Sequence, residues 1–155
     1  MKDELFGELS YDYLWEGKTK IKLYGTEYNL SLNIDGEEDD EIRQIQRESF
    51  IYYKKNENDI AKQIEEGIYN YYKSIYKYIR ERNDVNISEK VPDVINYLDM
   101  KKLIKPITFC IPYLDDDENR EIDILFECTW DFDLGMGVRI RNEKITKIGV
   151  QNDVL

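Results

Sequence analysis

The side chains that could do chemistry in this chain are chiefly carboxylates, because its 155 residues include no histidine. The lack of histidine excludes imidazole acid–base catalysis, the Ser-His-Asp and Cys-His arrangements that activate a nucleophile, and the HExxH metal motif. Acidic residues number 33 against 22 basic residues, which gives a net charge of -11. Nucleic acid and anionic membranes are therefore not expected as partners, since both need a protein that supplies positive charge.

The surplus of acidic residues is concentrated in two short segments. The six acids within residues 35–41 contribute -6, and the six acids within residues 115–123, offset by Arg120, contribute -5. Together these segments carry the whole net charge of -11, because the rest of the chain has 21 acids and 21 bases. Such loops often do no more than keep a sheet protein soluble, and the first precedes a predicted helix whose N-terminus favours negative charge.

The functional interpretation is that both acidic segments belong to one surface that binds a basic protein partner. A surface of this sign steers a basic protein toward it, at a rate that falls as salt is added. Whether the two segments converge depends on the strand order, which the sequence leaves open. The predicted partner-binding residues are Asp35, Glu37, Glu38, Asp39, Asp40, Glu41, Asp115, Asp116, Asp117 and Glu118.

Another pair of carboxylates, Asp131 and Asp133, begins like a calcium-binding loop. The segment lacks a third oxygen ligand and the glutamate at the twelfth position, so that a turn is predicted here rather than an ion site. Residues 115–118 could hold Mg²⁺ only loosely, because no phosphate cradle accompanies them. We predict no cofactor and no metal, and an enzyme that uses carboxylates or a metal near Asp131 and Asp133 stays as an alternative function.

Five of the 13 tyrosines lie on one predicted helix. They are Tyr69, Tyr71, Tyr72, Tyr76 and Tyr78. Aromatic residues beside basic ones can stack the bases of a single strand, but the net negative charge disfavours this use. Tyr72 belongs to an apolar stripe, and the others are expected to widen a buried face or to line an interface. A homo-oligomer built on this tyrosine-rich helix is the second alternative function.

The elements that must position these side chains follow from hydrophobic periodicity. Alternation predicts an antiparallel three-strand meander over residues 11–34, with turns at Glu16–Gly17 and Tyr24–Gly25. Two helices follow, over residues 42–55 and along the stripe from Ile60 to Ile79. For the second helix we predict an N-cap at Asn58 or Asp59, a stop at Asn83–Asp84, and a close crossing with another element at Gly67.

The last part of the chain is predicted to return to strands after a short helical turn over residues 92–98. The predicted strands are residues 104–113, 121–130, 137–141 and 144–150. Strands, then helices, then strands, with links of hairpin length, indicate an α+β fold. We predict an antiparallel sheet of about seven strands with the helices on one face, in a single domain of residues 1–155.

The two cysteines and the N-terminus indicate a cytoplasmic protein. Strand parity predicts that Cys110 and Cys128 point to opposite sides of the sheet, which disfavours a disulfide and fits a reducing compartment. The first residues carry no apolar stretch typical of a secretory signal, and no run approaches the length needed to cross a bilayer.

The segment FECTWDFDLGMGV, residues 126–138, carries a family resemblance. It resembles the ending of an uncharacterised bacterial domain family whose members typically read W-D-x-E-H-G-L-G-V here. The resemblance implies a stand-alone cytoplasmic protein, and some members are similar to immunity proteins encoded beside secreted toxins. This chain has Asp133–Leu134 in place of the family's glutamate-histidine pair. The motif residues are Trp130, Asp131, Asp133, Gly135 and Gly137, and their types are those of a tight turn between two strands.

The charge, the lack of histidine and the resemblance together predict a non-enzymatic cytoplasmic binding protein. Its partner is expected to be basic and to be held by the acidic loops, as an immunity-type protein would hold a co-encoded toxin.

Overall fold

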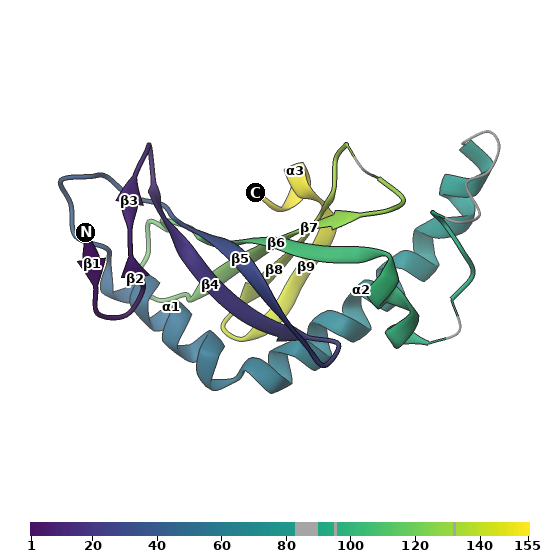
Figure 1. The fold of residues 1–155 in the computed structure, drawn as a ribbon, viewed down its shortest axis with the longest axis horizontal. Helices are drawn as coiled ribbons and strands as arrows, with labels where there is room; N and C mark the ends of the chain where they lie inside the picture. Colours follow the sequence, from purple (N-terminus) through teal and green to yellow (C-terminus); the bar gives the residue numbers. More distant parts are fainter. Residues whose placement is uncertain (83–89, 95, 132) are drawn as a thin grey trace.

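The structure is a computed structural model that describes residues 1–82, 90–94, 96–131 and 133–155 (Figure 1). Its main element is a seven-stranded sheet in which the strands lie side by side in the order of the sequence. The strands of this sheet are β3 (Ser10–Tyr11), β4 (Trp15–Leu23), β5 (Thr26–Ile34), β6 (Ile104–Ile111), β7 (Glu121–Cys128), β8 (Met136–Arg141) and β9 (Lys144–Val150). Two short strands, β1 (Lys2–Asp3) and β2 (Gly7–Glu8), form a separate antiparallel pair.

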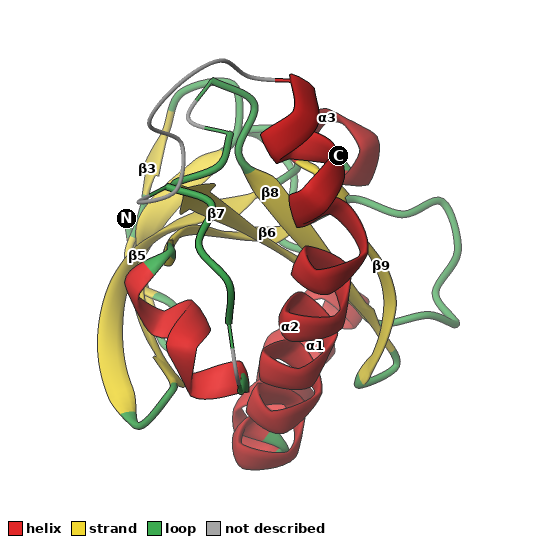
Figure 2. Cartoon of the chain, turned by 90° about the vertical axis from the view of Figure 1, so that its right-hand side faces the viewer, coloured by secondary structure: helices red, strands yellow, loops and turns green. Residues whose placement is uncertain are grey.

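Every neighbouring pair in the large sheet is antiparallel except β5 and β6, which are parallel. The link between these two strands contains both long helices, α1 (Gln44–Lys55) and α2 (Glu57–Arg82), and a chain that crosses over in this way can return parallel. Both helices lie against one face of the sheet (Figure 2). The predicted α+β class is therefore confirmed, with the correction that the sheet is mixed rather than purely antiparallel.

The first three strands form the predicted meander, but its first turn lies elsewhere than predicted. Tyr13 lies in the β3–β4 connection with a φ of +66°, whereas Glu16–Gly17 lies within β4. Gly17 leaves room for the segment around Leu9, which crosses β4 at this point. A Cβ at Gly17 would lie 2.8 Å from Leu9 Cδ2. The turn at Tyr24–Gly25 is confirmed, since both residues have positive φ, as a two-residue hairpin turn requires.

Helix α2 buries the predicted apolar stripe against the sheet. The residues Ile60, Ile64, Ile68 and Tyr72 are each at most 1% exposed. Gly67 marks the predicted close crossing, because a Cβ there would lie 2.6 Å from Ile148 Cδ1 on β9. The helix begins at Glu57, ahead of the predicted cap at Asn58 or Asp59. The predicted stop at Asn83–Asp84 lies outside the described residues.

The short helix predicted over residues 92–98 begins farther along the chain, as the 3-10 helix η2 (Tyr97–Lys102). Asn96 sets its start: the side chain accepts a hydrogen bond from Leu98 N at 2.9 Å, and Asn96 N donates to the Asp99 carboxylate at 3.1 Å. This reciprocal capping satisfies two free N–H groups at once. The sequence did not predict the β1–β2 pair or the C-terminal turn α3 (Gln151–Val154).

Both cysteines are free and lie on opposite faces of the sheet, as predicted. Cys128 is part of the buried core beneath the helices, whereas Cys110 lies opposite Asp123 on the face away from α1 and α2. We call that face the outer face. No helix in the described part of the chain is long and apolar enough to span a membrane.

Candidate functional site

The two acidic loops start side by side at one end of the sheet. Because β5 and β6 are parallel, their carboxyl ends meet at the same edge, and Ile34 pairs with Ile111 as the last residues of the two strands. The pairing continues into the loops, where Asp35 N donates to Ile111 O at 3.0 Å. The sequence could not show this convergence, since it follows from the parallel pair.

Gln46, on the first turn of α1, ties the two loops together. Its side chain is 2% exposed, and Nε2 donates to Asp35 O at 2.8 Å and to Pro112 O at 3.3 Å. Its Oε1 accepts from Arg43 N at 3.1 Å. One buried amide therefore contacts both loops and the start of the helix between them.

Gln46→Ala is expected to lower the free energy of unfolding by about 2 kcal/mol, because it leaves buried main-chain groups of both loops without partners. Gln44→Ala, at an exposed position of the same helix, is the matched control and is expected to change stability by less than about 0.5 kcal/mol. Urea denaturation of both variants measures the difference. Equal stability of the two variants would show that Gln46 does not hold the loops together.

Arg43, just before α1, is a cation that binds the second acidic loop. Its guanidinium donates to Leu114 O and to the Asp117 carboxylate, and it lies over the Tyr113 ring, 4.7 Å from the ring centroid. Carboxylate, carbonyl and aromatic face are three groups that a guanidinium binds well. The second loop is thus able to hold an arginine, and in this chain it holds the protein's own.

Nine of the ten predicted partner-binding residues are exposed, and Asp116 is half-buried. The Asp116 carboxylate accepts from Glu118 N at 3.0 Å and from Asn119 N at 2.9 Å, and these backbone hydrogen bonds lower its pKa below the ordinary value. Asp116 therefore shapes its own loop. We define the acidic surface as the other nine residues: Asp35, Glu37, Glu38, Asp39, Asp40, Glu41, Asp115, Asp117 and Glu118.

Exposed tyrosines lie beside the acidic surface, and sequence reasoning missed them because it counted Tyr13 and Tyr113 as strand residues. Tyr13 is 93% exposed and Tyr113 is 52% exposed. A hollow of about 720 Å³ is lined by Tyr11, Tyr13, Glu37, Glu38 and Asp39. Tyr11 Oη donates to Gly36 O at 2.9 Å, and its pKa is raised by partial burial and then by the charges of Glu37 and Glu38. Tyr13 turns out of the sheet with a positive φ, and its residue type, ordinary for a strand, gave no signal of this.

The motif residues build a turn between β7 and β8. The Asp131 carboxylate accepts from Leu134 N at 3.1 Å, and Asp131 O accepts from Gly135 N at 2.9 Å. Trp130 packs on Tyr72 of α2, with 4.9 Å between the ring centroids. Asp133 is exposed. Within the residues that the structure describes, no group of three or more Asp, Glu or Cys side chains could hold a metal ion.

The tyrosine-rich helix uses much of its aromatic surface inside the molecule. Tyr72 is fully buried, stacks on Tyr76 at 5.4 Å between centroids, and donates to Pro92 O at 2.6 Å. Tyr78 remains 56% exposed. A contact between copies of this chain could therefore use the rim of this helix but not Tyr72.

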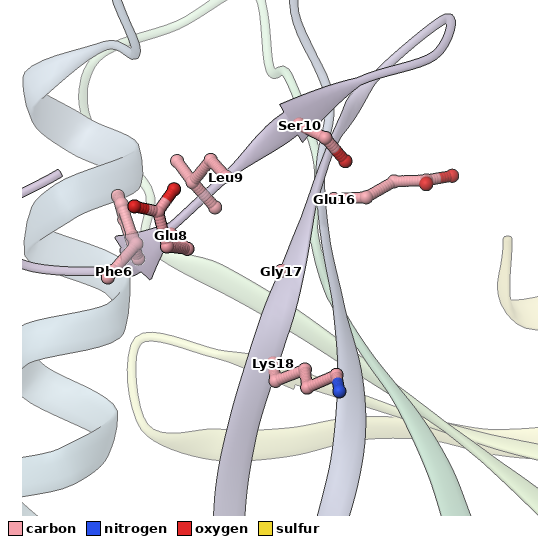
Figure 3. A pocket seen from close by; sticks show the side chains of 8 residues that line it. Phe6, Glu8, Leu9, Ser10, Glu16, Gly17 and Lys18 are labelled. Carbon is pink, nitrogen blue, oxygen red and sulfur yellow. The ribbon is translucent and has the colours of Figure 1, made fainter. Parts of the chain in front are cut away.

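A second hollow, of about 600 Å³, lies where the N-terminal strands cross the edge of β4 (Figure 3). Leu9 packs over Gly17, and the side chains of Ser10 and Glu16 point away from Leu9. Since its polar groups do not converge on one point, this hollow is a crossing of chain segments, and the acidic surface is the stronger candidate site.

A family model described as a domain of unknown function (DUF6985) matches residues 5–155, which is nearly the whole chain. No curated protein and no solved structure matches the sequence significantly. The prediction that the chain is a member of a domain family without an assigned function is confirmed.

Proposed function

Because the chain belongs to the DUF6985 family, whose description assigns no activity, we propose its function from the site: it is a non-enzymatic protein that binds a basic protein partner through the acidic surface. The observation that carries the proposal is the meeting of both acidic loops at the carboxyl ends of β5 and β6. Like charges repel, so bringing surplus carboxylates together costs stability unless a cation balances them. Arg43 balances only one of these charges.

The composition of the acidic surface supports a protein partner rather than a free metal ion. Exposed tyrosines are typical of protein interfaces, where one side of the ring is apolar and the hydroxyl bonds to water or to the partner. The contacts of Arg43 illustrate how an arginine is bound here, by a carboxylate and the face of Tyr113. A partner that presents arginine or lysine beside apolar side chains would meet the same groups at Tyr13 and Glu37.

The finer part of the proposal is that this protein is of the immunity type and acts in the cytoplasm of a bacterium. The support is the resemblance of residues 126–138 to an uncharacterised bacterial family that includes proteins similar to immunity proteins. Free cysteines fit a reducing compartment. The expected partner is then a basic protein encoded beside this one.

The test neutralises the acidic surface and measures binding of the neighbouring basic gene product by calorimetry at low and high salt. The surface variant changes Glu37, Glu38, Asp39, Asp115, Asp117 and Glu118 to the matching amides. We expect the wild type to bind more weakly as salt increases, and the variant to lose about tenfold or more in affinity at low salt. Its remaining affinity should depend little on salt.

The matched control neutralises the same number of exposed acids elsewhere. These are Glu27, Asp59, Glu66, Glu81, Glu127 and Asp153. Both variants have the same net charge, so a general charge effect would weaken their binding of the basic protein equally. Unchanged binding in the surface variant, or an equal loss in the control, would contradict the proposed site.

A further inference from the structure

Two carboxylates lie buried side by side on the outer face and share one guanidinium. Glu121 and Asp123 are two residues apart on β7, so their side chains point to the same face, and they are 5% and 2% exposed. Arg139 Nε, on β8, lies 3.3 Å from Glu121 Oε2 and 3.1 Å from Asp123 Oδ1. If both carboxylates are ionised, the cluster carries one uncompensated negative charge, which is costly in a buried place. One shared proton makes the cluster neutral.

The C-terminal turn α3 is held against the same guanidinium. Arg139 Nη2 donates to Val154 O, so a single side chain contacts the carboxylate pair and the turn. Val154 is fully buried, and it fits because β8 has Gly137 beneath it, where a Cβ would lie 2.9 Å from Val154 Cβ. In Figure 1, α3 lies on the side of the sheet away from α1 and α2. Gly137, the second glycine of the motif, therefore makes room for Val154 as well as following the β7–β8 turn.

We propose that α3 is a pH-sensitive latch, which is docked on the sheet while the buried Asp123, beside Glu121, holds a proton and is released more often once that proton is lost. The physical reason is linkage: α3 contacts the pair through Arg139, and its release opens that side of the cluster to water, which lowers the proton affinity of Asp123. Release is thus coupled to loss of a proton, and a higher pH favours it. Burial, followed by the charge of Glu121, raises the pKa of Asp123 to about 7 despite its bond with Arg139.

The remaining groups around the pair do not oppose this coupling. They are Cys110 on β6, Asp35 at the end of β5, Arg139 and Arg141 on β8, Lys147 on β9, and Asp153 on α3. The pKa of Cys110 is raised to about 12, chiefly by burial and then by the charges of Asp123 and Asp35, so the thiol stays neutral. The arginines stay charged at every relevant pH. Asp153 is exposed on the turn.

The experiment measures the population of the released state by ¹⁵N exchange-saturation NMR at the amides of residues 152–155, at pH 5.0 and pH 7.5. The docked Asp123, with a pKa of about 7, keeps its proton at pH 5.0 and has largely lost it at pH 7.5, so we expect the released population to rise at least tenfold across this range. Asp123→Asn cannot lose the proton, and its released population is expected to be the same at both pH values.

Three further variants keep the test decisive. Glu127→Gln removes an exposed acid from the same face of β7 and should behave as the wild type. Gly137→Ala crowds Val154 and should raise the released population at both pH values, which checks that the signal reports on the latch. If Asp123→Asn does not fold, Glu121→Gln is used instead. Because the charge of Glu121 raises the pKa of Asp123, its removal should make the released population rise at a lower pH. A wild-type population that does not change with pH, or one that changes equally in Asp123→Asn, overturns the proposal.

Discussion

Gly135→Val is expected to lower the free energy of unfolding by about 4 kcal/mol, in two ways that add. Gly135 has a φ of +64°, a conformation that is strained for any residue with a Cβ and most strained for a β-branched one. A Cβ at this position would also lie 2.8 Å from Phe126 O, a main-chain atom of β7 that cannot move without disturbing the sheet. Urea denaturation with tryptophan fluorescence measures the loss.

Two other glycines separate these causes. Gly7 has a φ of +79° but no atom within 4 Å of an added Cβ, so Gly7→Ala reports the backbone strain alone. Gly149 has neither a positive φ nor a close contact, since the nearest atom is 3.9 Å away, and Gly149→Ala should be nearly neutral. Gly135→Ala should cost more than Gly7→Ala. If Gly135→Val were as stable as the wild type, the motif would not be structural, and a functional role for it would have to be considered.

Arg139→Gln is expected to lower the free energy of unfolding by about 3 kcal/mol at pH 8, because it leaves two buried carboxylates without their cation. The loss should be smaller at pH 5.5, where the carboxyl groups can take up a proton instead. Arg141→Gln is the matched control on the same strand: its distance to Asp116 is 3.9 Å, both side chains are well exposed, and the change should cost less than about 1 kcal/mol.

The sign of the pH effect follows from Asp123. Its folded pKa of about 7 lies above the ordinary value of 3.8, so between these values the folded protein keeps a proton that the unfolded chain has lost. The contribution of this group to stability is therefore largest at low pH, falls as the pH rises from about 4 to about 7, and is constant above that. Without Arg139 the pKa rises further, so the fall continues beyond pH 7.

Urea denaturation at pH 5.5 and pH 8 tests this directly. We expect the difference in stability between wild type and Arg139→Gln to grow with pH, and the difference between wild type and Arg141→Gln to stay constant. A loss in Arg139→Gln that is the same at both pH values would mean that the carboxyl pair does not change its charge in this range.

The amino-acid sequence by itself determined the local elements and their faces. Alternation along residues 28–34 and the stripe from Ile60 to Tyr72 depend only on which side chains avoid water, so both the strand and the helix lie where they were predicted. The parity of Cys110 and Cys128 followed from the same alternation. The prediction failed where a residue of ordinary strand type turns out of the sheet, as Tyr13 does, and where a cap moves a short helix, as Asn96 does.

Only the tertiary structure decided where the two acidic loops lie relative to each other. Residues 35–41 and 115–118 are far apart in the sequence, and the loops that contain them start side by side because the crossover through α1 and α2 makes β5 and β6 parallel, a long-range pairing that leaves no local pattern. The same alternation that placed Ile122 and Ile124 in the core turned Glu121 and Asp123 to the outer face, where they are buried beside Arg139. Net charge is a property of the sequence, but whether a carboxylate faces water or a guanidinium depends on the neighbours that folding brings to it.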